Sequence, residues 1–565
     1  MKNIKIFCEN DKKYYQCKAG TNLLEVSKLC EKPEFTFLCA YVDNELKELG
    51  FELNNNHKVK FLNYLDPDGK RTFMRSISFV LQKVMADKYP EYSLVIDYAL
   101  PNGLYAELRD PKGDIDGSPK EIHFSHKEIE DIKQLMQDLI NKDLPFEKKK
   151  LPNDIAVELF KMNGRPEKAS LTEKRGKFFV SVYYLDSYPD TYYGPLLYST
   201  SYINIFDLMP YDDGFCIVLP SVIDPSKLIE YKHQFKLSQV FKENSDWCFK
   251  MGAKGMVNLN EAIHSGLTSK IVMAAEALHE RKYAKIADEI SAKKDKVKLV
   301  LISGPSSSGK TTTSKRVALQ TKIIGLNPVV IGMDDYFVER ANTPMDENGD
   351  YNFESLYALD LPLLNKDLNE LFEGKEIELP KFDFSEGRRL KSGKIIKLRE
   401  KDILIMEGIH ALNPDLLPEV ANERIFKIYA SALTSLQIDE NNCVSTTDNR
   451  LLRRILRDYR TRGVSPEETI MRWPSVRRGE IKNIFPYQEN ADVMFNSTLI
   501  YELPLLRYYV ESLLLRINPH SPAYSECRRL IKFLQFVIPM TPDEIKNIPP
   551  TSVMREFIGG SVFEY

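Results

Sequence analysis

The sequence reads GPSSSGKT from Gly304 to Thr311, a complete G-x-x-x-x-G-K-T motif, and this stretch decides the fold predicted for the second half of the chain. An apolar run at 298–302 leads into the motif, and a helical pattern at 312–324 follows it. Glycines let such a loop curl so that backbone N–H groups face a phosphate at the start of a helix. A Gly- and Ser-rich turn that binds nothing is the alternative. The strand before the motif and the helix after it favour nucleotide binding.

Within this motif, the lysine and the threonine carry the phosphate chemistry. Lys310 would neutralise β- and γ-phosphate oxygens, and the Thr311 hydroxyl would ligate Mg²⁺. ATP and Mg²⁺ are therefore the predicted cofactors. The predicted ATP-binding residues are Gly304, Ser306, Ser307, Ser308, Gly309, Lys310, Thr311 and Thr312.

From residue 297 onward, strand and helix patterns alternate, which predicts an α/β fold with a parallel sheet covered on both faces. Ligands bind outside the carboxyl ends of the strands in such a sheet. The strand at 328–333 ends in Asp334 and Asp335, and the strand at 402–406 ends in Glu407. A carboxylate at the first could accept a substrate hydroxyl's proton, and one at the second could hold Mg²⁺ or its water. Each acid alone could equally cap a helix or lie in a surface turn, but the phosphate loop on the same edge favours a function.

An arginine-rich helix is predicted at 450–463. Helical spacing stacks Arg450, Arg453, Arg454 and Arg457 along one stripe, opposite an apolar stripe. Guanidinium groups suit a lid that closes on phosphates, because they offset charge on the transferring group. Without the phosphate loop, a solvated amphipathic helix would be the preferred interpretation.

Taken in order, these blocks resemble the uridine kinase and phosphoribulokinase family of P-loop kinases over about residues 297–497. MDDYF at 333–337 is similar to the family's D-S-F-Y segment, and NFESLYALD at 352–360 to its N-F-D-H-P-D-A-F-D segment. PKFDF at 380–384 resembles P-x-Y-D-F, MEGI at 406–409 matches F-E-G-I, and 447–463 matches the arginine-rich lid.

The resemblance implies an ATP-dependent kinase that transfers the γ-phosphoryl group to a hydroxyl of a nucleoside similar to uridine or cytidine. It implies catalytic roles for Asp334, as general base, and for Lys310 and Arg457. It places Thr311 and Glu407 at the metal. The implied substrate-binding residues are Glu354 at the ribose, Phe382 and Phe384 beside the base, and Arg450 and Arg462 from the lid.

The acceptor pocket departs from the family pattern. A histidine that contacts the pyrimidine in uridine–cytidine kinases is Gly387 here, and the family's tyrosine and ribose aspartate are Phe382 and Glu354. We therefore expect weak discrimination among nucleosides, or another acceptor in the space beside Gly387, such as a sugar phosphate or a pantothenate-like alcohol. The neighbouring Arg388 and Arg389 would suit an anionic acceptor, or they are exposed lid residues.

The first half resembles the N-terminal region of threonyl-tRNA synthetase. The residues on which this resemblance rests lie at 19–26, 102–105, 144–147 and 190–195. The four metal-binding positions of that family's editing site fall on Arg75, Phe79, Tyr192 and Leu196. None of these side chains binds zinc at neutral pH, because imidazole or thiolate is required. The resemblance therefore implies a retained fold with a degenerate site.

At 565 residues the chain is too long for one hydrophobic core. We predict a β-grasp-like TGS domain at 1–62, which includes a helix at 22–30, and an α+β editing-like domain at 63–222. A helical linker region is expected at 223–296, the P-loop kinase domain at 297–497, and a helical C-terminal extension at 498–565. No chemical motif marks the extension.

Bulk properties limit location and partners. The net charge is −3, so no global basic field draws the chain to nucleic acid. The eight cysteines are scattered without a C-x-x-C pair, which argues against disulfides and cysteine zinc sites. No signal peptide or membrane span is apparent, so we expect a cytoplasmic protein without a membrane partner.

An alternative function, that of a binding protein rather than an enzyme, is a nucleotide-sensing factor associated with RNA or the ribosome. A sensor needs no base beside the γ-phosphate, whereas a kinase does, so Asp334 discriminates the two. We expect a small nucleoside-like substrate, a homo-oligomer, and a contact with RNA, if there is one, through the N-terminal half.

Overall fold

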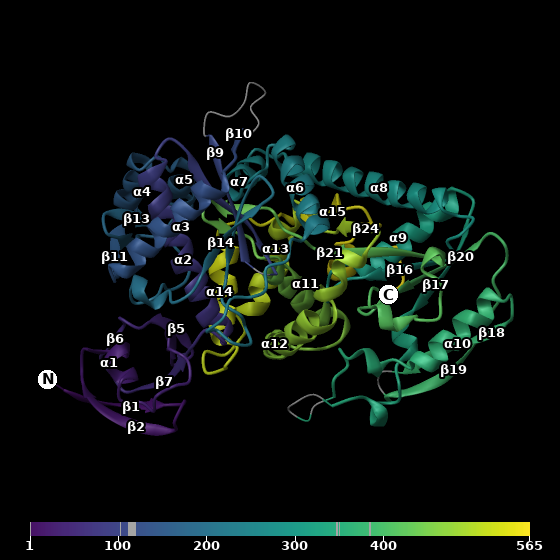
Figure 1. Ribbon diagram of the computed structural model, residues 1–565, viewed down its shortest axis with the longest axis horizontal. Coiled ribbons are helices and arrows are strands. Elements are labelled where there is room, and N and C mark those ends of the chain that lie inside the picture. The colour runs from purple at the N-terminus through teal and green to yellow at the C-terminus, as the bar shows by residue number, and fades with distance from the viewer. Residues whose placement is uncertain (1, 102, 111–119, 346–348, 350, 384–385) are drawn as a thin grey trace.

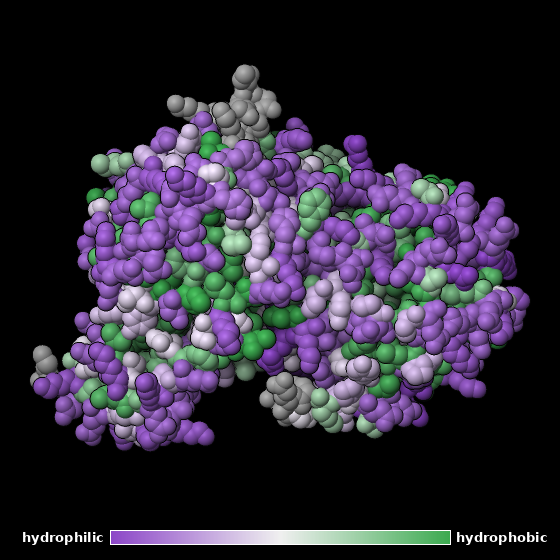
Figure 2. All heavy atoms as spheres, viewed as in Figure 1, coloured by the Kyte–Doolittle hydropathy of each residue, from purple (hydrophilic) through white to green (hydrophobic). Residues whose placement is uncertain are grey.

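The structure is a computed structural model that describes all residues except 1, 102, 111–119, 346–348, 350 and 384–385. The N-terminal elements and the kinase-like sheet lie at opposite ends of the long axis in Figure 1. The face in Figure 2 is mostly hydrophilic. Across the described residues, none of the helices combines the length and hydropathy that a membrane span requires.

The first sheet is built from the N-terminal 62 residues, with strand order β2-β1-β7-β4-β5. Its strands are β1 (Asn3–Cys8), β2 (Lys13–Lys18), β4 (Cys39–Val42), β5 (Glu45–Glu48) and β7 (His57–Leu62). β1 pairs parallel with β7, and the other neighbours are antiparallel. The helix predicted at 22–30 is shorter: α1 is Leu23–Ser27. It ends there because Leu23 and Val26 are buried, while Leu29 is exposed and gives a further turn nothing to pack on.

The second unit combines antiparallel sheets with helices. One sheet has the order β10-β9-β15-β14, with β8 on β9, and another the order β11-β12-β13. The strands are β8 (Ser93–Leu100), β9 (Gly103–Asp110), β10 (Lys120–Ile122), β11 (Phe146–Pro152), β12 (Phe179–Leu185), β13 (Tyr188–Asp190), β14 (Asp207–Tyr211) and β15 (Gly214–Val218). The helices are α2 (Pro67–Lys88), α3 (His126–Asn141), α4 (Asn153–Met162) and α5 (Pro166–Lys174).

The predicted helical linker is helical only from residue 235. It contains α6 (Phe235–Lys250), α7 (Met256–His264) and α8 (Thr268–Ala292). The preceding segment is held by turns and bridges instead, such as the pairing of Pro220 with Leu228.

A parallel sheet forms the centre of the second half, as predicted, with the order β17-β20-β16-β21-β24. The strands are β16 (Leu299–Ser303), β17 (Asn327–Gly332), β20 (Asp402–Glu407), β21 (Ile425–Ser431) and β24 (Val493–Asn496). Leu299 and Leu301 face a core shared with α10 (Leu361–Phe372). The alternate residues Val300 and Ile302 face a core shared with α8 and α9 (Lys310–Ile323). Helices therefore cover both faces.

Helices that follow β21 in the chain pack into one large core with α7 and α8. They are α11 (Thr446–Thr461), α12 (Pro466–Asn483), α13 (Glu502–Leu514), α14 (Tyr524–Leu534), α15 (Pro542–Lys546) and α16 (Arg555–Ile558). Because this core joins residues from before and after the sheet, the C-terminal extension is an integral part of the second half rather than an appendage.

A short hairpin of the kinase half, β22 (Gln437–Asp439) and β23 (Asn442–Cys443), packs into the second unit. Gln437 Nε2 donates to Asp97 Oδ1 at 2.8 Å, and the Ile96 N–H donates to the Glu440 carbonyl at 3.0 Å. Asn441 donates to the buried Asp190. The hairpin therefore joins the two halves through buried polar contacts.

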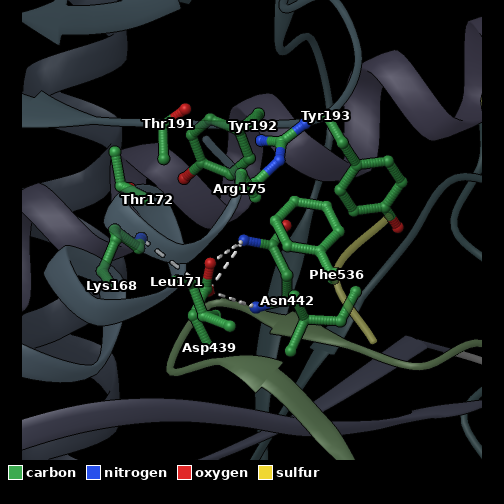
Figure 3. A pocket seen from close by; sticks show the side chains of 11 residues that line it. Lys168, Leu171, Thr172, Arg175, Thr191, Tyr192, Tyr193, Asp439, Asn442 and Phe536 are labelled. Carbon is green, nitrogen blue, oxygen red and sulfur yellow. Dashed lines mark hydrogen bonds and ion pairs between the residues drawn. The ribbon is translucent and has the colours of Figure 1, made fainter. Parts of the chain in front are cut away.

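Buried charges complete this junction. Lys168 is 1% exposed and pairs with Asp190, and its Nζ lies 3.7 Å from Asp439 Oδ1 (Figure 3). Arg165 Nη1 lies 3.1 Å from Asp190 Oδ2. Burial alone would raise the pKa of Asp190, but Lys168 and Arg165 outweigh it and hold that pKa below its usual range. The charges therefore neutralise one another across the junction.

Replacing Lys168 tests this junction. We expect Lys168→Met to lower the free energy of unfolding by about 3 kcal/mol, because it leaves buried carboxylates without their cation. The control is Lys174→Met on the same helix, since the Lys174–Glu261 pair is exposed and worth less than about 1 kcal/mol. Urea denaturation followed by tryptophan fluorescence measures both. Equal effects of the two changes would contradict the assigned role of Lys168.

Candidate active site

The phosphate loop joins β16 to α9 and needs glycine at two positions. Gly309 has φ +81°, in the left-handed region. A Cβ on Gly304 would lie 1.9 Å from the Ala430 carbonyl oxygen, so a side chain there would collide with β21. Within the described part of the chain, the buried hydroxyls of Ser307 and Ser308 have no hydrogen-bond partner. Such orphaned donors fit a loop built to hold the oxygens of a phosphate.

Three strand ends meet beside this loop. Glu407 is in register with Ile302 of β16 and with Gly332 of β17, so Glu407, the phosphate loop and Asp334 follow one edge of the sheet. Thr311 Oγ1 donates to Glu407 Oε1 at 2.8 Å. A hydroxyl and a carboxylate in contact provide the hard oxygen ligands that Mg²⁺ prefers, so these residues fit that ion.

The charges along this edge interact. Lys310 Nζ donates to the Pro305 carbonyl at 3.3 Å. Burial lowers the pKa of Lys310, and Glu407 and Asp334 oppose that shift. Burial raises the pKa of Glu407, and Lys310 opposes that shift. The lysine and the two acids therefore influence one another electrostatically.

The two neighbouring aspartates have different surroundings. Desolvation raises the pKa of Asp334, although its side chain keeps contact with solvent; Lys310 lowers that pKa, and Asp335 raises it further. Asp335 Oδ1 accepts the Phe382 N–H at 3.3 Å and so anchors β18 (Ile377–Asp383). Asp334 therefore lies within electrostatic range of Lys310, and Asp335 holds the neighbouring hairpin.

Arg450 and Arg453 of α11 are buried. Arg450 is 1% exposed, pairs with Glu480 and donates from Nε to the Ser306 carbonyl at 2.9 Å. The Ser306 N–H donates to Glu480 Oε1 at 2.9 Å. Arg453 forms a two-pronged pair with Glu502. Arg450 was predicted to bind substrate. Its guanidinium instead pairs with Glu480 and donates to the backbone of the phosphate loop, so it holds the loop in place.

Other arginines of the lid gather around one carboxylate. Asp458 is 3% exposed and pairs with Arg454 at 3.1 Å, Arg457 at 3.1 Å and Arg462 at 3.4 Å. Arg454 Nη1 also donates to Ser306 Oγ at 2.8 Å. Arg457 and Arg462 are thus held together near the loop, and Asp458 is an organising residue that the sequence did not single out.

The acceptor side contains Glu354 and Phe382. Burial raises the pKa of Glu354, and Arg454 is the largest opposing influence. A Cβ on Gly479 would lie 2.6 Å from the Glu354 Cβ, so that glycine makes room for Glu354 against α12. Phe382 is buried, 5.7 Å from the Phe337 ring. Phe384 lies outside the described residues.

The space expected beside Gly387 is filled. Gly387 has φ +69°, and a Cβ there would lie 2.7 Å from Arg340 Nε. Arg388 pairs with Glu386, and Arg389 Nη2 donates to Asp360 Oδ2 at 2.8 Å. The side chain that lies against this position from elsewhere in the chain is therefore that of Arg340. The two arginines predicted from sequence pair with neighbouring acids.

The four editing-site positions of the first half form part of its core. Phe79 and Leu196 are both 0% exposed, and the Phe79 and Tyr192 rings lie 5.5 Å apart. Arg75 Nε donates to the Pro195 carbonyl at 3.0 Å. Side chains from these positions are therefore packed in the core of the second unit.

Two of the eight cysteines, Cys8 and Cys30, lie close together in the structure although they are 22 residues apart in sequence. Cys8 Sγ and Cys30 Sγ lie 3.4 Å apart, and Asp11 is close enough to share an ion with them. The Asp11 carboxylate already accepts the Lys13 N–H at 3.2 Å, the Glu31 N–H at 3.4 Å and the Tyr15 hydroxyl. Since its oxygens are engaged, this cluster fits a packed turn better than a metal centre.

A parallel sheet whose first strand runs into G-x-x-x-x-G-K-T, with acids at the same edge, defines a P-loop nucleotide-binding domain. Residues 299–501 match the phosphoribulokinase / uridine kinase family. A uridine kinase from Ligilactobacillus salivarius is 30% identical over 204 residues, which cover 36% of this chain and 86% of that protein. A uridine kinase from Staphylococcus epidermidis is 29% identical over 197 residues, which cover 35% and 86%.

A solved structure of a possible uridine kinase from Bacillus stearothermophilus aligns with 37% of this chain and 100% of that chain, at 18% identity and a TM-score of 0.24. Through residues 299–501, the chain belongs to the phosphoribulokinase / uridine kinase family.

Glu480 provides a test of how the loop is held. We expect Glu480→Gln to weaken ATP binding and to lower the free energy of unfolding by about 3–5 kcal/mol, because Arg450 stays buried without its carboxylate. Glu468→Gln on the same helix is the control, since a glutamine keeps the capping box with Ser465. Calorimetric titration with ATP and urea denaturation measure both effects. Unchanged ATP affinity in Glu480→Gln would show that the loop does not need this support.

Proposed function

We propose that the second half is an ATP-dependent kinase that transfers the γ-phosphoryl group to a hydroxyl of a small nucleoside-like molecule. The observation that carries the proposal is the common sheet edge of Lys310, Glu407 and Asp334, where the acid within electrostatic range of Lys310 at the end of β17 is separate from the acid that contacts Thr311. A loop that only sensed a nucleotide would not require this second acid.

The chemistry follows from these positions. The acceptor hydroxyl gives its proton to the Asp334 carboxylate while its oxygen attacks the γ-phosphorus, and the bond to the β-phosphate oxygen breaks to release ADP. Lys310 and Arg457 offset the negative charge that spreads over the transferring group. Mg²⁺, held through Thr311 and Glu407, would neutralise charge on the β- and γ-phosphates.

A nucleoside is the preferred acceptor. The relatives from Ligilactobacillus salivarius and Staphylococcus epidermidis are named uridine kinases, and this chain covers 86% of each. Glu354 would bind the ribose, and Phe382 would flank the base. Arg462 would contact the bound phosphates from the lid.

Arg340 favours a second candidate, a small alcohol with an anionic or strongly polar group. Its guanidinium takes the space that a side chain at position 387 would need. A guanidinium pairs with carboxylate and phosphate oxygens in two-pronged geometry, and it also donates to carbonyl oxygens of a base. The chemistry of this residue therefore fits both acceptors.

For the first half, we propose TGS-like and editing-like folds at 1–62 and 63–222 with a degenerate metal site. The filled core around Phe79 and Tyr192 supports this assignment. The boundaries at 223–296, 297–497 and 498–565 are part of the same proposal, and homo-oligomer formation, RNA contact and a cytoplasmic location stay predictions.

The two aspartates provide a matched pair for the general base. We expect Asp334→Asn to keep ATP binding and to slow turnover by about 10²–10⁴-fold, and Asp335→Asn to be milder. Because the pKa of Asp334 is raised and the base must be ionised, turnover should fall as the pH drops through a value above the ordinary aspartate range. In Asp335→Asn this acidic limb should move to lower pH, since a neighbouring negative charge is removed. If the Asp335 change is the more severe, the base is Asp335.

Competition among acceptors tests the reaction itself. Uridine, cytidine, purine nucleosides and non-nucleoside alcohols are offered together with Mg-ATP, and Lys310→Ala provides the inactive protein. We expect Arg340→Ala to raise KM for the preferred acceptor about tenfold, with KM for ATP unchanged, because it loses a charged hydrogen-bond donor. Arg388→Ala is the control, since Arg388 is exposed and paired with Glu386. A preference for uridine and cytidine that survives Arg340→Ala would show that another residue binds the base.

A further inference from the structure

The C-terminal segment 549–565 lies on the phosphate loop. This segment is outside the stretch that matches the kinase family, and the C-terminus is marked beside the parallel sheet in Figure 1. Arg316 Nη1 of α9 donates to the Thr551 carbonyl at 2.7 Å, and Arg460 Nη1 of α11 donates to the Phe557 carbonyl at 3.2 Å. Helices from both sides of the loop therefore hold the segment in place.

One carboxylate of this segment contacts the loop directly. Thr312 Oγ1 donates to Glu556 Oε2 at 2.6 Å, and the Thr312 N–H lies 3.4 Å from the same oxygen. The Tyr565 hydroxyl lies 3.0 Å from Thr312 Oγ1. The side chain of Val553 packs against Gly309, since its Cγ2 lies 2.5 Å from where a Cβ on that glycine would be.

These donors are the ones that a phosphate would use. Thr312 is the third residue of α9, so its N–H has no partner within the helix and points to the end where anions bind. Glu556 also lies within electrostatic range of Lys310 and Glu407. A carboxylate and a phosphate oxygen at this point compete for the same donors and repel each other.

We propose that Glu556 is an internal competitor of the nucleotide, and that a nucleotide phosphate binds at Thr312 only after this carboxylate has moved away. The inference rests on the proposed function for the identity of the nucleotide as ATP. A segment that merely lined the nucleotide site would leave the loop's donors free, whereas Glu556 occupies the N–H and the hydroxyl of one residue.

The C-terminal segment contains two successive glycines about which its last five residues can rotate. Phe557 and Ile558 are 1% and 4% exposed and belong to the large core, so α16 stays anchored. Gly559 and Gly560 follow directly, with φ of +83° and +72°. Two successive glycines in this region give the chain a hinge between the anchored helix and the last five residues. Thr312 can therefore be freed by a movement of the Glu556 side chain and of residues 561–565, while the large core stays intact.

The test compares Glu556→Gln with the wild-type protein by calorimetric titration with the slowly hydrolysed analogue ATPγS, in the presence of Mg²⁺ and without an acceptor. We expect the variant to bind about tenfold more tightly, because loss of a charged hydrogen bond raises the fraction of molecules in the open state. Glu564→Gln is the control: it removes the same charge from an exposed side chain of the same segment and should bind as the wild type does. In the wild type, ATPγS should also increase amide hydrogen exchange in 559–565.

Each outcome decides the proposal. Affinity in Glu556→Gln that equals or falls below that of the wild type overturns it. If this variant does not fold, the wild-type exchange experiment decides, and unchanged exchange in 559–565 overturns it equally. Tight ATPγS binding without phosphoryl transfer to any acceptor would refute the proposed kinase function but not the competition. The absence of ATPγS binding in both proteins would refute both.

Discussion

The carboxylate of Glu480 is the interaction on which the kinase site depends. It accepts from the Ser306 N–H of the phosphate loop and pairs with Arg450 of α11 and with Arg477, which precedes it by three residues in α12. A buried charge of this kind is stable only when all of its partners are present. These contacts hold the loop, α11 and α12 together. Because Arg454 and Asp458 lie on α11, the same contacts determine where these two residues stand relative to the loop.

The first half of the chain is also connected to α11, through the hairpin β22–β23 and through α14. The hairpin β22–β23 packs against the second unit and ends just before α11. Arg529 of α14 pairs with Asp448 in the first turn of α11 at 2.6 Å. Arg71 of α2 in turn pairs with Glu526 of α14 at 2.8 Å. The start of the arginine-rich helix is thus set by contacts with both halves. These ion pairs connect the second unit of the fold to the helix that contacts the phosphate loop.

Local patterns in the sequence predicted the parallel sheet, the phosphate loop and the acids at its edge, because each depends on residues close together in the chain. What the patterns could not predict are partners that come from far away. Glu480 lies 30 residues after Arg450, and Glu556 lies 244 residues after Thr312, with no motif around either acid. Gly387 was predicted to leave a space because the sequence does not show that Arg340 folds back over it. The apolar extension likewise has no local signal for its contact with α9.

The buried junction around Lys168 and Asp439 has a consequence for whether the two halves can be separated. Separation of the halves would leave each with an unmatched charge where it now has a neutral, buried interface. Neither part would then be a self-sufficient unit, although each has its own sheet. Cutting the chain between the halves would therefore expose charged groups on both new surfaces at once. The shared interface, more than any linker, makes the two halves depend on each other for stability.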